Sequence, residues 1–377
     1  MMRKIFHVKK WYLLWVVFYI ANIAVSASSV SPEALKKLDA HVKKKIDEGS
    51  AVGCAIAVLD HDQVVFLKTY GVKKKGAQEK INTNTIFQIG SISKPITATV
   101  LAILHKSGSL NIHDSAQTHL PYLHPDTKIH HILAHTTGYN RMGWNNKIES
   151  SIFRPQLLEA LITTSRQREP GQEFDYHNVV YSLLEEILES TQKLSFKDIV
   201  HEKLFKPLGM QRATVGYEDF INQDNKAWPH TVGKNKKFYP SKSYSKFYHG
   251  AVASAAGVNA SIMDMIPFLR LQIIGDDNLL STRDLELFHQ PHTTAPDLFL
   301  WFKDQMQGKL KSYYGLGWRI VENDRCRVVF HGGYVKGFIS FLGFLPDKKI
   351  GIIVLHNGQN IFSAETGIKF LSDWVQE

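Results

Sequence analysis

The sequence is poor in cysteine: its 377 residues include only Cys54 and Cys326. Each lies in or beside an apolar stretch typical of a strand, which favours a small buried side chain. A disulfide between the two is the less favoured alternative. Because two isolated cysteines match no metal-binding or redox spacing, we exclude a cysteine-based metal or redox site.

Long hydrophobic runs are equally scarce. The run from Trp11 to Val25 is short for a transmembrane helix, which needs about 20 apolar residues. Basic residues precede it, residues 1–27 contain no acid, and Val25-Ser26-Ala27 offers small residues for cleavage. We therefore expect residues 1–27 to be a signal peptide and the protein to be periplasmic or secreted. An uncleaved signal is the alternative, and it would anchor the chain to the membrane.

Aromatic residues are not interleaved with the short lysine runs at 43–45 and 73–75. The net charge is +10, and four of these charges lie within residues 1–27, which leaves +6 for the remainder. Scattered lysines without aromatic partners favour solvated surfaces over a nucleic-acid patch. We expect no nucleic-acid partner, although a mild preference for anionic surfaces stays open. The oligomeric state is not indicated.

Repeats and low-complexity linkers are absent from residues 28–377, which we expect to form a single domain. With 44% hydrophobic residues, the chain can bury a substantial core. Strand-like runs lie near both ends and helical periodicity fills the middle. This order predicts one α/β (α+β) sheet lobe from about 28–90 and 250–377, with a mainly helical lobe at about 91–249 inserted. Such a layout places an active site between the lobes.

The pattern also predicts individual elements. The expected helices are Pro32–Glu48, Ser93 to about Gly108, Leu157–Thr163, Val179–Ser190, Ser195–Leu204, Ile262–Ile274 and Ile368–Val375. The expected strands are Ala51–Leu59, Val64–Tyr70, Leu316–Glu322, Arg327–His331, Gly337–Leu345 and Ile350–His356. The polar and aromatic segment Glu218–Lys246 is expected to be an exposed irregular loop.

Three short motifs carry the chemistry. The first is Ser91-Ile92-Ser93-Lys94, which places a lysine amine beside a serine hydroxyl on one helix face. A desolvated lysine can activate a serine nucleophile, and the helix N-terminus offers N–H donors to an oxyanion. Taken alone, such a serine more often caps a helix and such a lysine more often points to solvent.

The second motif is Tyr176-His177-Asn178, in a loop that follows a Pro-Gly turn. A tyrosine hydroxyl can relay protons if neighbouring cations lower its pKa, and an asparagine amide can bind an ester or amide substrate. The third is His331-Gly332-Gly333-Tyr334, at the end of an expected strand. Its glycines would let a substrate approach the strand edge.

Together and in this order, the motifs resemble the Ser-x-x-Lys, Tyr-x-Asn and Lys/His-x-Gly signatures of the serine β-lactamase and penicillin-binding protein superfamily. The resemblance is greatest to the class C β-lactamase-like branch. It covers about residues 32–375, with further matches at 133–138, 207–210, 257–265, 314–318 and 351–357. It implies the β-lactamase/transpeptidase-like fold, with an antiparallel sheet flanked by helices, and an enzyme without metal or organic cofactor.

The resemblance also implies a role for each residue. Ser91 would be the acylated nucleophile, while Lys94 and Tyr176 would move its protons. Asn178 would bind the substrate, together with His331, Gly332 and Gly333. The backbone N–H groups of Ser91 and Tyr334 would form the oxyanion hole.

The third motif departs from the Lys-Thr-Gly of typical class C β-lactamases. Histidine is largely neutral at pH 7, so His331 would grip a substrate carboxylate less strongly than lysine does. The hydroxyl of the middle position is also missing at Gly332. Lys336 is a candidate replacement for the lost charge. The departure favours a D-amino-acid peptide, peptidoglycan-type compound or small ester as substrate, with β-lactam hydrolysis or a non-hydrolytic penicillin-binding sensor as alternatives.

Four histidines, His124, His130, His131 and His135, lie close together in the sequence. No carboxylate or cysteine follows them at ligand spacing, so we expect no metal site.

Overall fold

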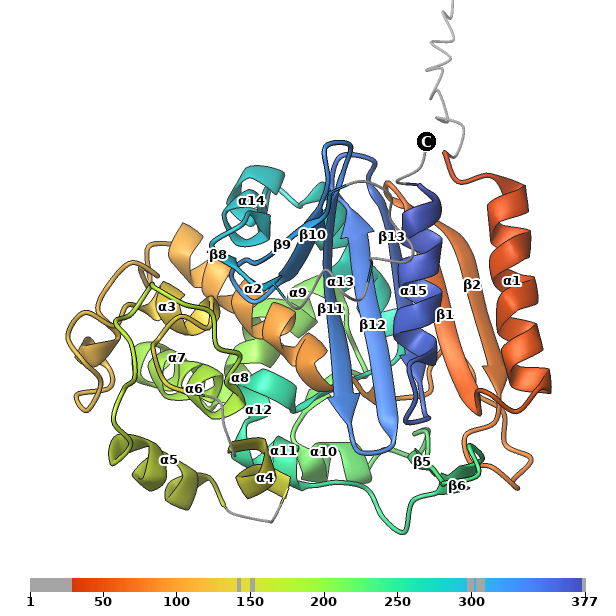
Figure 1. Cartoon of the computed structure of the whole chain (residues 1–377), viewed down its shortest axis with the longest axis horizontal. Helices are drawn as coiled ribbons and strands as arrows, with labels where there is room; N and C mark the ends of the chain where they lie inside the picture. The colour runs from red at the N-terminus through yellow and green to blue at the C-terminus, as the bar shows by residue number, and fades with distance from the viewer. Residues whose placement is uncertain (1–28, 141–143, 150–152, 297–301, 303–308, 375–377) are drawn as a thin grey trace, which may run out of the picture.

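In the computed structural model, strands from both ends of the chain form one eight-stranded sheet with antiparallel neighbours (Figure 1). The strand order is β2-β1-β13-β12-β11-β10-β9-β8. The strands are β1 (Gly53–Asp60), β2 (Gln63–Gly71), β8 (Thr293–Thr294), β9 (Lys311–Tyr314), β10 (Arg319–Glu322), β11 (Arg327–Val335), β12 (Phe338–Leu345) and β13 (Ile350–His356). The predicted fold class, an antiparallel sheet flanked by helices, is confirmed.

The structure describes residues 29–140, 144–149, 153–296, 302 and 309–374. The signal peptide expected at 1–27 lies outside these ranges and stays a prediction. Within them, no helix has both the length and the apolar character needed to cross a membrane.

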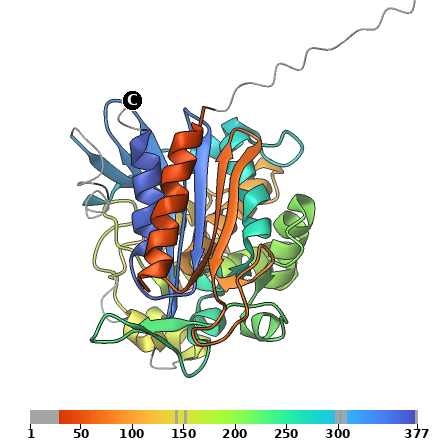
Figure 2. The ribbon, with the colours of Figure 1, turned by 90° about the vertical axis from the view of Figure 1, so that its right-hand side faces the viewer.

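Helices cover both faces of the central sheet. On one face, α1 (Pro32–Asp47) and α15 (Phe362–Asp373) lie side by side, as Figure 2 shows. On the other, α13 (Ile262–Ile274) packs against β1 and β13. Alternate residues of β1 therefore enter two separate cores: Ile56 and Val58 face α1 and α15, and Ala57 faces α13. Burial on both faces explains why the strand is apolar from residue 53 to residue 59.

The remaining elements build the helical side and two small sheets. The helices are α2 (Ser93–Lys106), α3 (Ile129–Leu133), α4 (Trp144–Glu149), α5 (Arg154–Ile162), α6 (Asn178–Ser182), α7 (Leu184–Gln192), α8 (Phe196–Val200), α9 (Lys206–Leu208), α10 (Tyr217–Ile221), α11 (Phe247–Ala251), α12 (Ala253–Ala256) and α14 (Thr282–His289), with short turns η1 (Gly90–Ile92), η2 (Ala116–Thr118) and η3 (His201–Phe205). The small sheets have the orders β3-β7-β4 and β5-β6, formed by β3 (Phe87–Gln88), β4 (Thr214–Val215), β5 (His230–Val232), β6 (Phe238–Pro240) and β7 (Val258–Ala260).

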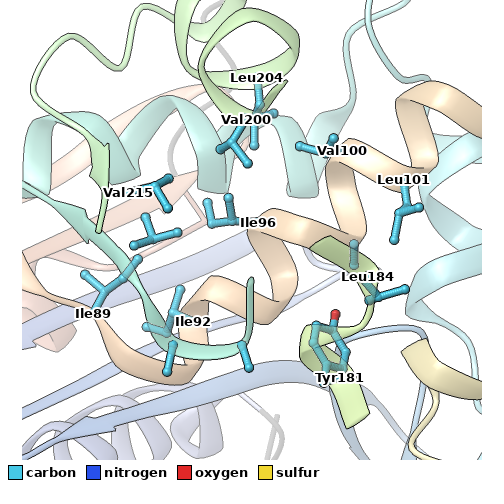
Figure 3. Close-up of a cluster of buried hydrophobic side chains, with 14 of the residues drawn as sticks. Ile89, Ile92, Ile96, Val100, Leu101, Tyr181, Leu184, Val200, Leu204 and Val215 are labelled. Atoms are coloured by element: carbon cyan, nitrogen blue, oxygen red, sulfur yellow. The ribbon is translucent and has the colours of Figure 1, made fainter. Parts of the chain in front are cut away.

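Helix α2 lies at the centre of the helical side. Figure 3 shows Ile96, Val100 and Leu101 of this helix among apolar side chains from neighbouring segments. Its first turn is also tied down by hydrogen bonds: the Ser93 hydroxyl donates to Gly90 O at 2.7 Å and accepts from Val258 N at 2.9 Å. The preceding turn, η1, is therefore held in place against β7.

The segment Glu218–Lys246 was predicted wrongly. It contains α10 and the β5–β6 pair, and it buries Phe220 and Phe238. These apolar residues are too far apart in the sequence to form a periodic pattern, yet Phe220 joins the main core and Phe238 packs against His356. Both cysteines are free and buried, which agrees with the favoured interpretation.

Candidate active site

Ser91 lies in η1, the single turn that leads into α2. Gly90 makes this turn possible, because its φ of +56° is a conformation that other residues rarely adopt. A Cβ at Gly90 would lie only 2.6 Å from Tyr334 N. Glycine therefore lets β11 approach η1 closely, which brings the backbone of Tyr334 beside the serine.

Lys94 is fully buried directly behind Ser91. Its Nζ lies 3.3 Å from Ser91 Oγ, 2.7 Å from Asn178 Oδ1 and 3.0 Å from Ala255 O. Burial is the main reason that the pKa of this amine lies well below its usual value, and the positive charge of Arg319 lowers it further. The lysine therefore has a raised fraction of neutral amine.

Tyr176 and Asn178 reach the site from the loop before α6 and from its first residue. The buried Tyr176 hydroxyl lies beside Ser91 and Arg319, and the Lys94 amine is 4.5 Å from the centre of its ring. Burial raises the pKa of Tyr176, an effect that Arg319 and Ser91 only partly offset, so the resting side chain is a phenol. Asn178 donates from Nδ2 to Asn145 Oδ1 at 2.8 Å.

His331 is completely buried and does not line the cavity. Its Nε2 lies 3.1 Å from the Tyr314 hydroxyl, and its Nδ1 lies 2.8 Å from Gly332 O. Burial, with the positive charge of Arg319, holds its pKa well below the usual value. The histidine is therefore neutral and lies behind the site, with both ring nitrogens facing protein partners.

The strand β11 exposes one edge beside Ser91. Residues Arg327–Phe330 pair with β10, whereas the strand register pairs His331–Val335 with β12 alone. Gly332, Gly333 and Tyr334 line the cavity along this open edge. The geometry therefore provides both an N–H donor for an oxyanion and a strand edge for an extended substrate.

These side chains surround one cavity of about 540 Å³. Ser91, Tyr176, Asn178 and the third-motif glycines all line it, so three motifs that are far apart in the sequence meet here. The volume falls within the range typical of small-molecule sites.

A profile of the Beta-lactamase family matches residues 38–370 of this sequence. The chain belongs to the beta-lactamase family. Members of this family are serine hydrolases, and the class C branch indicated by the motifs stays a prediction.

Curated relatives of this beta-lactamase family protein are distant in sequence. Protein flp of Staphylococcus aureus strain MW2 is 24% identical over 348 residues, covering 86% of this chain and 63% of that protein. Penicillin-binding protein 4* of Bacillus subtilis strain 168 is 23% identical over 322 residues, covering 81% and 68%. The chain thus spans less than two thirds of the length of the flp relative.

Solved structures establish the β-lactamase/transpeptidase-like fold. The octameric penicillin-binding protein homologue from Pyrococcus abyssi has a TM-score of 0.79 at 24% identity, covering 91% of this chain and 77% of that chain. EstCE1, a hydrolase with promiscuous acyltransferase activity, has a TM-score of 0.76 at 20% identity, covering 92% and 99%.

Two residues in this family site were missed from the sequence. Arg319 lines the cavity from β10, with its guanidinium carbon 5.3 Å from the centre of the Tyr176 ring. Asn145, from α4, is the second missed residue, and it orients Asn178.

Lys336, the candidate replacement for the third-motif lysine, does not join this site. It is exposed in the turn after β11 and does not line the cavity.

The histidines that are adjacent in the sequence separate into different environments. His135 is buried against Tyr176, with the ring centres 4.4 Å apart, and its Nδ1 accepts from His177 N. His130 and His131 lie beside each other at α3. Within the part of the chain that the structure describes, no group of three or more His, Cys, Asp or Glu side chains could hold a metal ion.

Proposed function

We propose that this chain cleaves ester or amide bonds through an acyl-enzyme on Ser91. The observation that carries the proposal is the position of the buried Lys94 amine. Asn178 Oδ1 and Ala255 O are carbonyl oxygens, so they can only accept hydrogen bonds from it. Two N–H groups of a neutral amine meet these oxygens, and the lone pair is then directed to Ser91 Oγ. That lone pair can take the serine proton.

The acylation step follows from this geometry. As Ser91 Oγ bonds to the substrate carbonyl carbon, its proton passes to Lys94 Nζ. The N–H groups of Ser91 and Tyr334 stabilise the oxyanion. The Tyr176 phenol gives its proton to the leaving group and recovers one from Lys94. Water then attacks the acyl carbon with the same groups acting in reverse, which releases the acid and restores the serine.

Arg319 supports a substrate that carries an anionic group. It is a guanidinium at the cavity wall, where a carboxylate can bind it through paired hydrogen bonds. A D-amino-acid peptide with a free carboxylate fits this chemistry, as do peptidoglycan-type peptides. Small esters fit the acyl-transfer geometry without needing the arginine.

Arg319 also supports a second candidate, β-lactam hydrolysis, because β-lactams carry a carboxylate. The neutral, buried His331 argues against the carboxylate grip of a typical class C enzyme. A penicillin-binding sensor would share the acylation step but would not release the acyl group.

A substrate panel tests these possibilities. Wild type and Ser91→Ala are assayed with p-nitrophenyl acetate, a chromogenic cephalosporin and an N-acylated D-alanyl-D-alanine. We expect ester or peptide turnover that is lost in the variant, with weaker cephalosporin turnover. Cephalosporin turnover well above the other two would favour β-lactam hydrolysis. Equal activity of wild type and Ser91→Ala on every substrate would overturn the proposed function.

A further inference from the structure

The cavity continues beyond the catalytic side chains to a second, apolar wall. Its apolar part is formed by Ile339 of β12, by Ile361 just before α15, and by Ala364 and Ile368 of that helix. We call these four residues the α15 wall. Glu365 of α15 also lines the cavity there, with its carboxylate paired to Lys45. Ala364 and Ile368 are four positions apart, so they share one helix face. Ile361 is 73% exposed, so its apolar surface is accessible to a bound ligand.

Gly332 lines the cavity on the face of β11 that leads to the α15 wall. Its neighbour Gly333 faces the opposite side of the sheet, where a Cβ would lie 1.9 Å from Ile89 O. Because side chains alternate along a strand, Gly332 faces the same side of the sheet as Tyr334. Ile339, which lies opposite Tyr334 on β12, faces that side as well. A side chain at this glycine would therefore stand between β11 and the α15 wall.

Gly332 occupies the middle position of the third motif, where the sequence departs from Lys-Thr-Gly. The Lys-Thr-Gly signature has a branched side chain at the middle position, on the face that leads to the α15 wall. Glycine removes that side chain and its hydroxyl together. The same change that removes a polar contact to substrate thus also removes side-chain volume on the face of β11 that leads to the α15 wall.

The α15 wall is held rigidly. The Ser363 hydroxyl donates to the backbone of β12 at 3.0 Å, and Lys45 pairs with Glu365 at 3.1 Å, which ties α15 to α1. Gly367 packs directly on the Phe341 ring, since a Cβ there would lie 2.1 Å from a ring carbon. The space is therefore preformed and does not need an induced movement.

We propose that the α15 wall is a binding subsite for an apolar chain of the substrate, and that Gly332 determines this specificity. The proposal rests on the proposed acyl transfer at Ser91, because the subsite is continuous with that cavity. Its occupant is an alkyl or aryl group attached to the reacting ester or amide. Either the acyl part or the leaving group of a substrate can carry such a group, and the turnover experiment shows which of the two binds at the α15 wall.

A binding measurement tests the subsite without relying on turnover. Butyrate and octanoate are titrated calorimetrically into Ser91→Ala, which removes the nucleophile. Burial of one methylene strengthens binding about fourfold at most. We expect octanoate to bind at least about tenfold more tightly than butyrate, since it has four more methylenes. Adding Ala364→Phe or Gly332→Thr should reduce this ratio to below about threefold.

A control away from the cavity is Ile162→Ser in the same Ser91→Ala background, because Ile162 is an exposed isoleucine at the end of α5 that does not line the cavity. It should keep the full octanoate preference. Equal binding of the two acids to Ser91→Ala would overturn the proposal. A preference that survives both Ala364→Phe and Gly332→Thr would also overturn it, because the chain would then bind elsewhere.

Turnover then assigns the occupant. The wild-type enzyme is assayed with p-nitrophenyl esters of increasing acyl length and with acetate esters of increasing alcohol length. A rise of kcat/KM in the first series places the acyl chain at the α15 wall, and a rise in the second places the leaving group there. Absence of a rise in both, with acetate still hydrolysed, counts against the subsite while leaving the proposed function intact. Absence of any Ser91-dependent hydrolysis counts against the proposed function, and the binding ratios still decide the subsite.

Discussion

At the scale of single residues, the protonation of Lys94 decides what Ser91 can do. A buried ammonium would lose its hydration, and the positive Arg319 nearby adds to the cost. Both effects favour the neutral amine, which is the form that accepts a proton. Tyr176 has the complementary property, because burial keeps its phenol protonated and ready to donate.

Replacing Arg319 by Met should shift the acidic limb of the pH dependence of kcat/KM to higher pH. Arg319 is one cause of the low pKa of Lys94, so removing its charge raises that pKa. Lys94 then keeps its proton up to a higher pH. As the pH is lowered, the variant therefore loses the active neutral amine at a higher pH than the wild type does. The measurement is kcat/KM for p-nitrophenyl acetate, a neutral substrate, across the pH range in which the enzyme stays folded.

Arg319→Lys is the control for this shift, because it retains a positive charge and should keep the acidic limb near its wild-type position. With a carboxylate-bearing peptide, Arg319→Met should in addition lower kcat/KM by about 10- to 100-fold relative to the neutral ester, the value of a lost charged hydrogen bond. An unchanged acidic limb together with unchanged selectivity would show that the arginine has neither role.

The sequence indicated Ser91, Lys94, Tyr176 and Asn178 because each lies in a short motif with a recognisable spacing. Arg319 has no such signal. It joins the site because the register of β10 and β11 places it opposite Phe330, next to the third motif. Side-chain direction at a strand end cannot be obtained from spacing alone, which is also why the sequence left open whether Lys336 replaces the missing lysine.

At the scale of elements, the close contact between η1 and β11 assembles the site. Replacing Gly90 by Ala should lower kcat by about 10²- to 10³-fold, the usual cost of an impaired oxyanion hole. The added methyl group would push the Tyr334 backbone away from Ser91. Steady-state kinetics with p-nitrophenyl acetate measure the loss, and thermal unfolding measures the effect on stability.

Gly108→Ala provides a matched control for strain. Gly108 also has a positive φ, +72°, but no atom lies within 4 Å of the added Cβ. Both variants should lose about 1 to 2 kcal/mol of stability from the left-handed conformation. Only Gly90→Ala should lose activity, and a comparable loss in both variants would mean that strain alone explains the effect.

Elements with strong local patterns were predicted closely. Helix α13 has the predicted bounds, and the expected hairpin corresponds to β1 and β2 within two residues at each end. The helix expected at Ile368–Val375 begins earlier, at Phe362. Its first turns were not predicted because Ala364 and Gly367 are small residues that give little apolar periodicity. The β3-β7-β4 sheet was not predicted, since strands of two or three residues carry no period.

At the scale of the whole molecule, buried histidines are a conspicuous feature. His177, His249, His289 and His356 are buried, and burial lowers their pKa values to between about 3 and about 4. Each is neutral when folded and takes up a proton when the chain unfolds below pH 6.5. Glu185 has the opposite effect, because burial raises its pKa to about 7. The histidines outnumber it, so acid should destabilise the fold.

The free energy of unfolding should therefore fall as the pH falls from about 6.5 to 4. For His249, whose pKa is about 4, the contribution lost over this window is about 3 kcal/mol. Urea unfolding at several pH values measures the slope. His249→Gln should make the free energy of unfolding less dependent on pH, by about one proton. A free energy that rises towards pH 4 would contradict the prediction.

The central claim, that Ser91 carries an acyl group during turnover, is tested most directly by intact-mass spectrometry. The protein is mixed with p-nitrophenyl acetate, quenched in acid within the first turnovers, and weighed whole, with peptide mapping to locate the modification. We predict one added acetyl group per chain, located on Ser91, that disappears as the ester is consumed. No adduct should form in Ser91→Ala. Turnover without an adduct, or an adduct that maps to another residue, would contradict the account.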